Sequence, residues 1–168
     1  MDGSRAYCDD MPAAIETAHP PQLLLNAVNP VLRVAIGLPV VGSSLKDFMV
    51  MNFKGRKSGR RFSIPVSAHH LDGDLYAILE AGWKHNFAEG APVDVVHAGK
   101  TTPMHGLLIT DPTTVADIAL RVATAYGPKK AQRSTGLKFT SGTIPSRDEF
   151  VEAAMRLHIA AIKLTPGS

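Results

Sequence analysis

A short cationic segment is the part of this sequence best suited to binding an anion. Five of the eight residues from 54 to 61 are Lys or Arg, and none is acidic. Gly55 and Gly59 would let the backbone turn with positive φ, so that amide N–H groups converge on an anion. Arg presents a planar fork to phosphate or carboxylate oxygens, and Ser58 adds a hydroxyl donor. The segment predicts an anion-binding turn; a solvated hairpin turn that only aids solubility is the alternative.

Two further features are typical of a site for a flat ring. Pro65 lies inside a strand pattern, and proline lacks the N–H donor of a sheet ladder, so it belongs at an edge or where pairing is interrupted. Free backbone groups there could bond a planar heterocycle, although an ordinary edge strand would look the same. Trp83 is the only tryptophan and lies in a polar loop. It could form the wall of a ring pocket with Asn86 fixing the loop, or it could simply anchor that loop in the core.

Other chemistries have no candidate residues. No two of the seven histidines are four residues apart, so we expect no metal site. The single cysteine, Cys8, excludes a disulfide framework and suits a reducing, cytoplasmic compartment. No G-x-S-x-G motif is present to mark a nucleophile. No exposed aromatic residues alternate with the basic ones, so we expect no nucleic-acid partner.

Length and composition indicate one globular domain. The chain has 168 residues, 45% of them hydrophobic and 20% charged. We expect a mobile N-terminal segment over 1–21 and a single domain over 22–164. Residues 22–36 predict a helix. The apolar stretch 23–42 contains Arg33, Pro30 and Pro39, which argue against a membrane-spanning helix but leave peripheral membrane contact open.

The middle of the chain alternates with period two. We expect five strands, at Lys46–Phe53, Arg61–His70, Asp74–Glu80, Pro92–Ala98 and Met104–Thr110. Asp72-Gly73 predicts a two-residue hairpin turn. Asp111-Pro112 predicts the start of a helix, and a basic loop is expected over 127–145. A capping box at Ser146 predicts a last helix that extends to Leu164. The class is α+β: an antiparallel barrel of five to six strands with an N-terminal helix and C-terminal helices.

The order of these motifs resembles a known family, the deazaflavin-dependent nitroreductases. These are actinobacterial split β-barrel proteins related to the FMN-binding, pyridoxamine-phosphate-oxidase-like flavoproteins. The similarity covers roughly residues 23–126. It rests on Asn29-Pro30, the 55–61 turn, Pro65-Val66, Asp72-Gly73, Trp83-x-x-Asn86 and Gly90-Ala91-Pro92-Val93.

The resemblance implies an enzyme that uses coenzyme F420. Its turn would contact the phosphate and the acidic glutamyl tail, and its ring would lie along Pro65 and Val66, facing Trp83. The implied reaction is hydride transfer from reduced deazaflavin to an electron-poor enone, quinone or nitro compound. The cofactor-binding residues so implied are Met51, Asn52, Arg56, Lys57, Ser58, Gly59, Arg60, Arg61, Pro65, Val66, Trp83 and Asn86.

Tyr126 is the implied catalytic residue, because Ala125-Tyr126 matches the step at which the substrate side of the family begins. The tyrosines that follow in the family are Lys129 and Gln132 here, so nitroreductase activity itself is left open. FMN is the alternative cofactor, since the turn would suit a single phosphate. A non-catalytic protein that binds deazaflavin or a tetrapyrrole is a further alternative. A small-molecule electron acceptor is the expected partner, and a homodimer is compatible with the resemblance.

Overall fold

The computed structural model describes residues 13–17 and 47–167. The predicted helix over 22–36, the apolar stretch 23–42 and Cys8 lie outside the described residues. Within the described part of the chain, no helix is long and apolar enough to cross a membrane.

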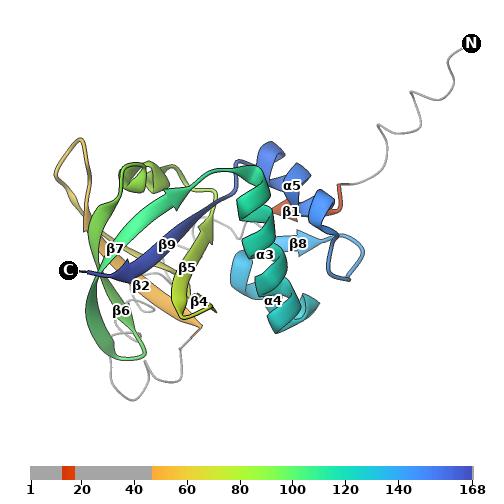
Figure 1. Ribbon diagram of the computed structural model, residues 1–168, viewed down its shortest axis with the longest axis horizontal. Helices are drawn as coiled ribbons and strands as arrows, with labels where there is room; N and C mark the ends of the chain where they lie inside the picture. The colour runs from red at the N-terminus through yellow and green to blue at the C-terminus, as the bar shows by residue number, and fades with distance from the viewer. Residues whose placement is uncertain (1–12, 18–46, 168) are drawn as a thin grey trace, which may run out of the picture.

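The chain folds around one curled, antiparallel sheet of seven strands (Figure 1). Their order across the sheet is β3-β2-β6-β7-β9-β5-β4. The strands are β2 (Phe48–Lys54), β3 (Arg61–Ser67), β4 (His69–Leu71), β5 (Asp74–Leu79), β6 (Ala91–His97), β7 (Lys100–Ile109) and β9 (Ala160–Pro166). The α+β class and the split-barrel architecture expected from the sequence are confirmed.

The inner face of the curled sheet holds an apolar core. Along β2, Met49, Met51 and Phe53 are buried, and they pack with side chains from all the longer strands. Phe62, Ile64 and Val66 of β3 face the same core, as their alternation predicts. The Asp72-Gly73 turn is confirmed: both residues have positive φ, 54° and 84°, as a tight hairpin between twisted strands requires.

The strand predicted over Arg61–His70 is two strands. β3 pairs with β2, whereas β4 pairs with β5. Between them Ala68 leaves the ladder, and its N–H donates to the Asp47 carbonyl at 2.9 Å. The chain thus passes from one edge of the sheet to the other within one residue. This crossing closes one end of the barrel. The sequence could not reveal the crossing, because the alternation of apolar and polar residues continues through Ala68.

The last predicted helix is confirmed in its first part, and the prediction is wrong for its second part. The Ser146 capping box is present, and α5 covers Arg147–Arg156. His158 then adopts a left-handed φ of 54°, and the chain enters the sheet as β9, between β7 and β5. Ile162 and Leu164 are fully buried there. A short apolar run fits a helix or a buried strand equally well in sequence, and the vacant place in the sheet decides between them.

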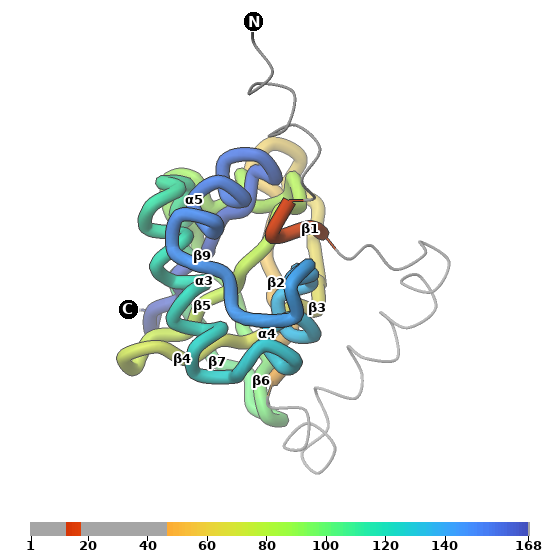
Figure 2. Tube along the Cα trace, turned by 90° about the vertical axis from the view of Figure 1, so that its right-hand side faces the viewer, coloured from red at the N-terminus to blue at the C-terminus, as the bar shows by residue number. Residues whose placement is uncertain are grey.

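The helical half of the molecule covers one end of the sheet (Figures 1 and 2). As predicted, Asp111 caps α3 (Pro112–Tyr126) by accepting from the Thr114 N–H. The expected basic loop over 127–145 instead contains α4 (Pro128–Thr135) and β8 (Leu137–Phe139). β8 pairs with β1 (Ile15–Thr17), and Ile15 is fully buried. Residues 15–17 of the segment expected to be mobile therefore form a strand that packs on the domain.

Candidate functional site

The cationic turn connects β2 to β3 at the exposed end of the hairpin. The Gly55 N–H donates to the Arg60 carbonyl at 2.7 Å, and the Gly59 N–H donates to the Gly55 carbonyl at 2.9 Å. Gly59 has the expected positive φ, 69°. Gly55 is needed for a different reason, since a Cβ there would lie 2.9 Å from both Phe62 and Ser58.

Four backbone amides of this turn bond within the protein and do not face an anion. Besides the two glycine N–H groups, the Arg60 N–H donates to Ser58 Oγ at 3.2 Å. The Arg56 N–H donates to Asn86 Oδ1 at 2.8 Å. These four amides are already used within the protein. The side chains of the turn and the N–H groups of Lys57 and Ser58 are then the groups that an anion could contact.

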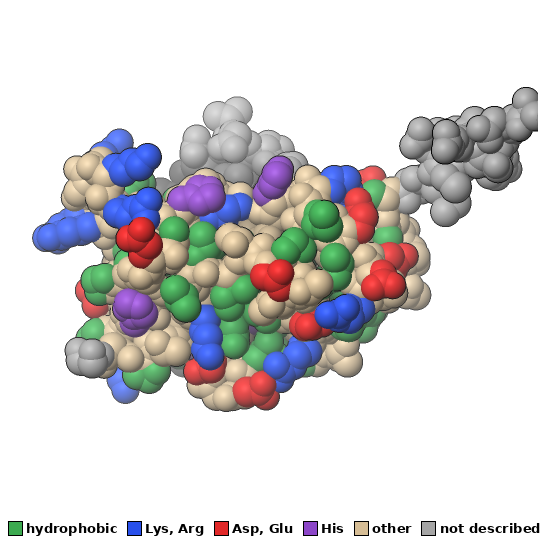
Figure 3. Space-filling view, turned by 45° about the horizontal axis from the view of Figure 1, so that its top comes forward, with side chains coloured by type: hydrophobic (Ala, Val, Ile, Leu, Met, Phe, Trp, Pro, Cys, Tyr) green, Lys and Arg blue, Asp and Glu red, His purple; other side chains and the backbone are tan. Residues whose placement is uncertain are grey.

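The cationic side chains of the turn are exposed and point outward. Among the ion pairs formed between described residues, none involves Lys54, Arg56, Lys57, Arg60 or Arg61. Figure 3 shows Lys and Arg side chains gathered at the end of the molecule from which the β2–β3 turn projects. Their positive charge is thus not compensated by any carboxylate of the described chain, and it remains available to a ligand.

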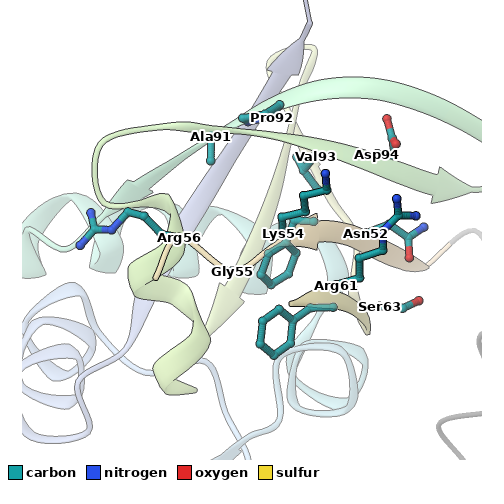
Figure 4. A pocket seen from close by; sticks show the side chains of 12 residues that line it. Asn52, Lys54, Gly55, Arg56, Arg61, Ser63, Ala91, Pro92, Val93 and Asp94 are labelled. Carbon is teal, nitrogen blue, oxygen red and sulfur yellow. The ribbon is translucent and has the colours of Figure 1, made fainter. Parts of the chain in front are cut away.

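A groove of about 770 Å³ runs from the turn along the outer face of β3, β2 and β6. The strand register explains its polar lining, because Asn52 lies opposite both Ser63 and Asp94, and Lys54 lies opposite Arg61. Figure 4 shows the Lys54 and Arg61 side chains on the same side, with Arg56 extending away from them beyond Gly55. The groove is therefore lined by three cations, Lys54, Arg56 and Arg61, and by polar groups that can bond hydroxyls, Asn52, Ser63 and Asp94.

A second cavity, of about 270 Å³, lies where the barrel is split. Its lining brings β3, the end of β5 and the α4–β8 junction together. Pro65 and Val66 form one side and Trp83 belongs to another, so these three predicted residues do meet. Pro65 lies on an edge strand, as its missing N–H requires. We call this cavity the slit.

Asn86 joins the cationic turn to the slit. It lies on the short helix η1 (Gly82–Phe87), which also carries Trp83. Its side-chain Oδ1 accepts from the Arg56 N–H, and its Nδ2 donates to the Trp83 carbonyl, both at 2.8 Å. The Trp83 ring packs against Phe53 with centroids 5.6 Å apart. Asn86 therefore fixes the loop, as expected, and does so against the turn.

Two predicted site residues lie away from both cavities. Met51 is fully buried in the barrel core, so it lines neither the groove nor the slit. The hydroxyl of Tyr126 donates to the Ala68 carbonyl at 3.4 Å, and Lys130 Nζ lies 4.7 Å from its ring centroid. Burial raises the pKa of Tyr126, and the Asp47 carboxylate adds to that shift. The contacts of both residues are structural.

The remaining predicted residues form the tip of the turn. Lys57, Ser58, Gly59 and Arg60 are exposed and line neither cavity. A ligand confined to the groove or the slit would not need them. A ligand with a long acidic extension could reach them.

Sequence reasoning missed residues that line these cavities or support them. Asp94 joins the groove only through the pairing of β6 with β2. Gly136 and Leu137 line the slit from a segment expected to be a loop. Lys84 is buried beside the slit, although its polar neighbours in sequence suggested an exposed position. Of these residues, only Asp94 could have been found from the sequence, because the period-two alternation of its strand places it on the same face as Pro92 and Val96.

His69 is a buried titratable residue that lies outside both cavities. His69 is fully buried, and neither of its ring nitrogens has a hydrogen-bond partner among the described residues. Burial lowers the pKa of His69 to about 4, with His70 adding to the shift and Asp47 opposing it. Across the described residues, no group of three or more His, Cys, Asp or Glu side chains could hold a metal ion.

Comparisons with known proteins add little to this geometry. No protein-family model and no curated protein sequence matches this chain. A solved structure described as a domain-swapped dimer is similar to it with a TM-score of 0.44 at 13% identity. That similarity covers 87% of this chain and 100% of the other.

Proposed function

We propose that this chain is an F420-dependent oxidoreductase. It would transfer a hydride from reduced deazaflavin to an electron-poor small molecule such as an enone, a quinone or a nitro compound. The observation that carries the proposal is the bridge made by Asn86. Its one side chain bonds both the cationic turn and the backbone of Trp83, so a site for an anion and a site for a ring are held in fixed relation.

The residues present fit such a cofactor. The groove has the volume of a typical cofactor site, which spans roughly 300–1,000 Å³. Lys54, Arg56 and Arg61 would hold phosphate or carboxylate groups, while Asn52 would bond hydroxyls. Pro65, Val66 and Trp83 would contact the ring. When bound, the reduced deazaflavin supplies the hydride.

The chain's own contribution is to hold and orient the reactants. Apolar side chains from β3 and β5 line the slit and would exclude water around a bound ring, which would strengthen electrostatic interactions there. Fixing the ring against a rigid wall lowers the entropy cost of bringing it to the acceptor.

The tip of the turn distinguishes the two candidate cofactors. Lys57 and Arg60 line neither cavity, so a single phosphate, as in FMN, would not need them. The acidic tail of F420 extends beyond its phosphate and could use both. Exposed cations beyond the groove therefore favour F420 over FMN.

The test is a binding and turnover experiment on the purified protein. Fluorescence titration with F420 and with FMN is expected to give tighter binding for F420, weakened by added salt. The variant K57A/R60A should lose affinity for F420 and keep its affinity for FMN. Reduced F420 should then be oxidised when menadione or cyclohexenone is supplied.

Other results of the titrations would change or exclude the proposed function. Binding of F420 without turnover would make the chain a carrier. Binding of FMN in preference to F420 would replace the cofactor. If neither F420 nor FMN binds, the proposal fails.

A further inference from the structure

A buried lysine, Lys84, lies next to Trp83 in sequence but lines neither the groove nor the slit. Lys84 is only 6% exposed. Its ammonium donates to the His158 carbonyl at 2.6 Å and to the Glu80 carbonyl at 3.2 Å. Burial lowers the pKa of Lys84, and the Glu80 carboxylate opposes that shift. Placing an ammonium group here carries a desolvation cost, so its two carbonyl contacts need to be well formed.

The two acceptors of Lys84 lie beside two neighbouring strand ends that border the slit, because β5 pairs with β9 and Leu79 lies opposite Ala160. Glu80 lines the slit at the end of β5, and Ile159, which follows His158, lines it from the start of β9. His158 adopts the left-handed conformation, with φ of 54°, at the turn between α5 and β9. Through its ammonium group, Lys84 therefore joins η1 to the α5–β9 turn, which lies 74 residues further along the chain.

The far end of η1 is anchored without this lysine. Phe87 is fully buried and packs so closely on Gly106 that a Cβ there would lie 2.7 Å from the Phe87 ring. Asn86 is bonded to the turn. At the near end, Trp83 has packing contacts with Phe53 and Phe87. Lys84 supplies the long-range hydrogen bond at that end.

We propose that Lys84 is a positioning residue, whose ammonium fixes Trp83 as a rigid wall of the slit by tying η1 to the α5–β9 turn. That the slit receives a flavin-like ring rests on the proposed function; that Lys84 immobilises Trp83 does not. Lys84 acts through Trp83 and contacts no ligand itself.

The experiment uses Trp83 as its own reporter, because it is the only tryptophan in the chain. K84M keeps the aliphatic stem and removes the donors, K84R keeps a cation with donors, and K100M is a matched exposed control. Acrylamide quenching of Trp83 should rise at least about twofold in K84M, return toward wild type in K84R and stay unchanged in K100M.

Ligand binding separates positioning from general destabilisation. K84M should bind F420 up to roughly tenfold more weakly, because binding would then have to immobilise Trp83. Its affinity for a polyglutamate peptide, measured by calorimetry, should change less than about twofold, because the turn is held by Asn86.

The results that would overturn the inference are equally specific. Unchanged quenching in K84M would mean that Lys84 does not hold Trp83. Equal losses for F420 and the peptide would mean that its role is only general stability. If K84M does not fold, K84L, which also removes the donors, is measured in its place by the same criteria. If the wild-type protein binds no F420, the proposed function fails while the quenching series still decides the role of Lys84.

Discussion

The cations of this protein divide into two groups with different surroundings. Outside the β2–β3 turn, several are paired with carboxylates. The pairs are Arg121–Asp72, Arg147–Asp117 and Arg156–Glu152 at 2.6 Å, Lys163–Asp74 at 3.0 Å and Lys130–Asp47 at 3.2 Å. At the turn, five cations lie within eight residues, and none joins an ion pair among described residues. The paired group neutralises its own surface, whereas the turn concentrates charge that repels itself and attracts anions.

This difference separates binding from stability. Exposed ion pairs contribute little to folding, and unpaired surface cations contribute nothing favourable to it. Neutralising the turn should therefore change ligand affinity and leave stability intact. Neutralising the paired cations should lower the free energy of unfolding slightly and leave ligand affinity unchanged. The size of the loss depends on the other groups that each cation bonds.

The largest effect is expected from the double variant R56A/K57A. Each lost charge-assisted contact should weaken F420 binding by about 1–3 kcal/mol, and the free energy of unfolding should hardly change. The control is K100A/R133A, which removes the same charge from exposed positions elsewhere. Fluorescence titration of both variants checks this, and equal affinities in the two would remove the turn from the site.

Acid should destabilise the fold through a buried histidine rather than through the exposed ion pairs. In the folded protein the pKa of His69 is lowered from 6.5 to about 4. Above pH 6.5 this group is neutral in both states. As the pH falls from 6.5 toward 4, only the unfolded chain takes up the proton, so stability is lost across that window. The full loss is roughly 3 kcal/mol.

The measurement is the free energy of unfolding by urea between pH 7 and pH 4. In H69L this part of the pH dependence should disappear, while in H85Q, which changes an exposed histidine, it should remain. A wild-type slope that persists in H69L would assign the acid sensitivity to other groups.

A smaller effect is expected at Arg156, which does more than form an ion pair. Its guanidinium donates to the Ile15 carbonyl at 2.6 Å and so holds β1 against the helical half. R156A should lower the free energy of unfolding by about 1–2 kcal/mol, without weakening F420 binding. E152A removes the ion pair alone and should cost no more than about 0.5 kcal/mol. Equal losses in the two would mean that the carbonyl contact contributes nothing.

The smallest effect is expected at Arg121, whose pair with Asp72 is largely exposed on both sides. R121A should change the free energy of unfolding by about 0.2–1 kcal/mol. The change should shrink further in high salt, because exposed charges are screened. Urea denaturation at low and high salt checks it, and a loss that is both large and independent of salt would contradict the division between the two groups.

The local features of the fold could be predicted from the sequence because each depends on neighbouring residues. Asp72-Gly73 forms its hairpin turn, Asp111 caps α3 and Ser146 opens α5. The strand β9 could not be predicted in this way. Its residues satisfy a helical and a strand pattern alike, and only the space between β7 and β5 selects the strand.

The candidate site shows the same division. Pro65 at a sheet edge, Asn86 as an anchor and the exposed cations of the turn all follow from the chemistry of single residues. Met51 and Tyr126 were assigned from resemblance, and their contacts in the structure are with the core and with the Ala68 carbonyl. The roles of Asp94 and Lys84 depend on partners 42 and 74 residues away along the chain, Asn52 and His158.

Sequence by itself determined the two faces of the strands between residues 48 and 109, the Asp72-Gly73 turn, the starts of α3 and α5 and the density of positive charge between β2 and β3. These depend on side-chain type and on spacings of a few residues. Tertiary structure alone decided that the chain crosses the sheet at Ala68, that β9 enters its centre and that Lys84 is buried. The physical reason is that each of these is a competition between distant segments for the same buried space and the same hydrogen-bond partners.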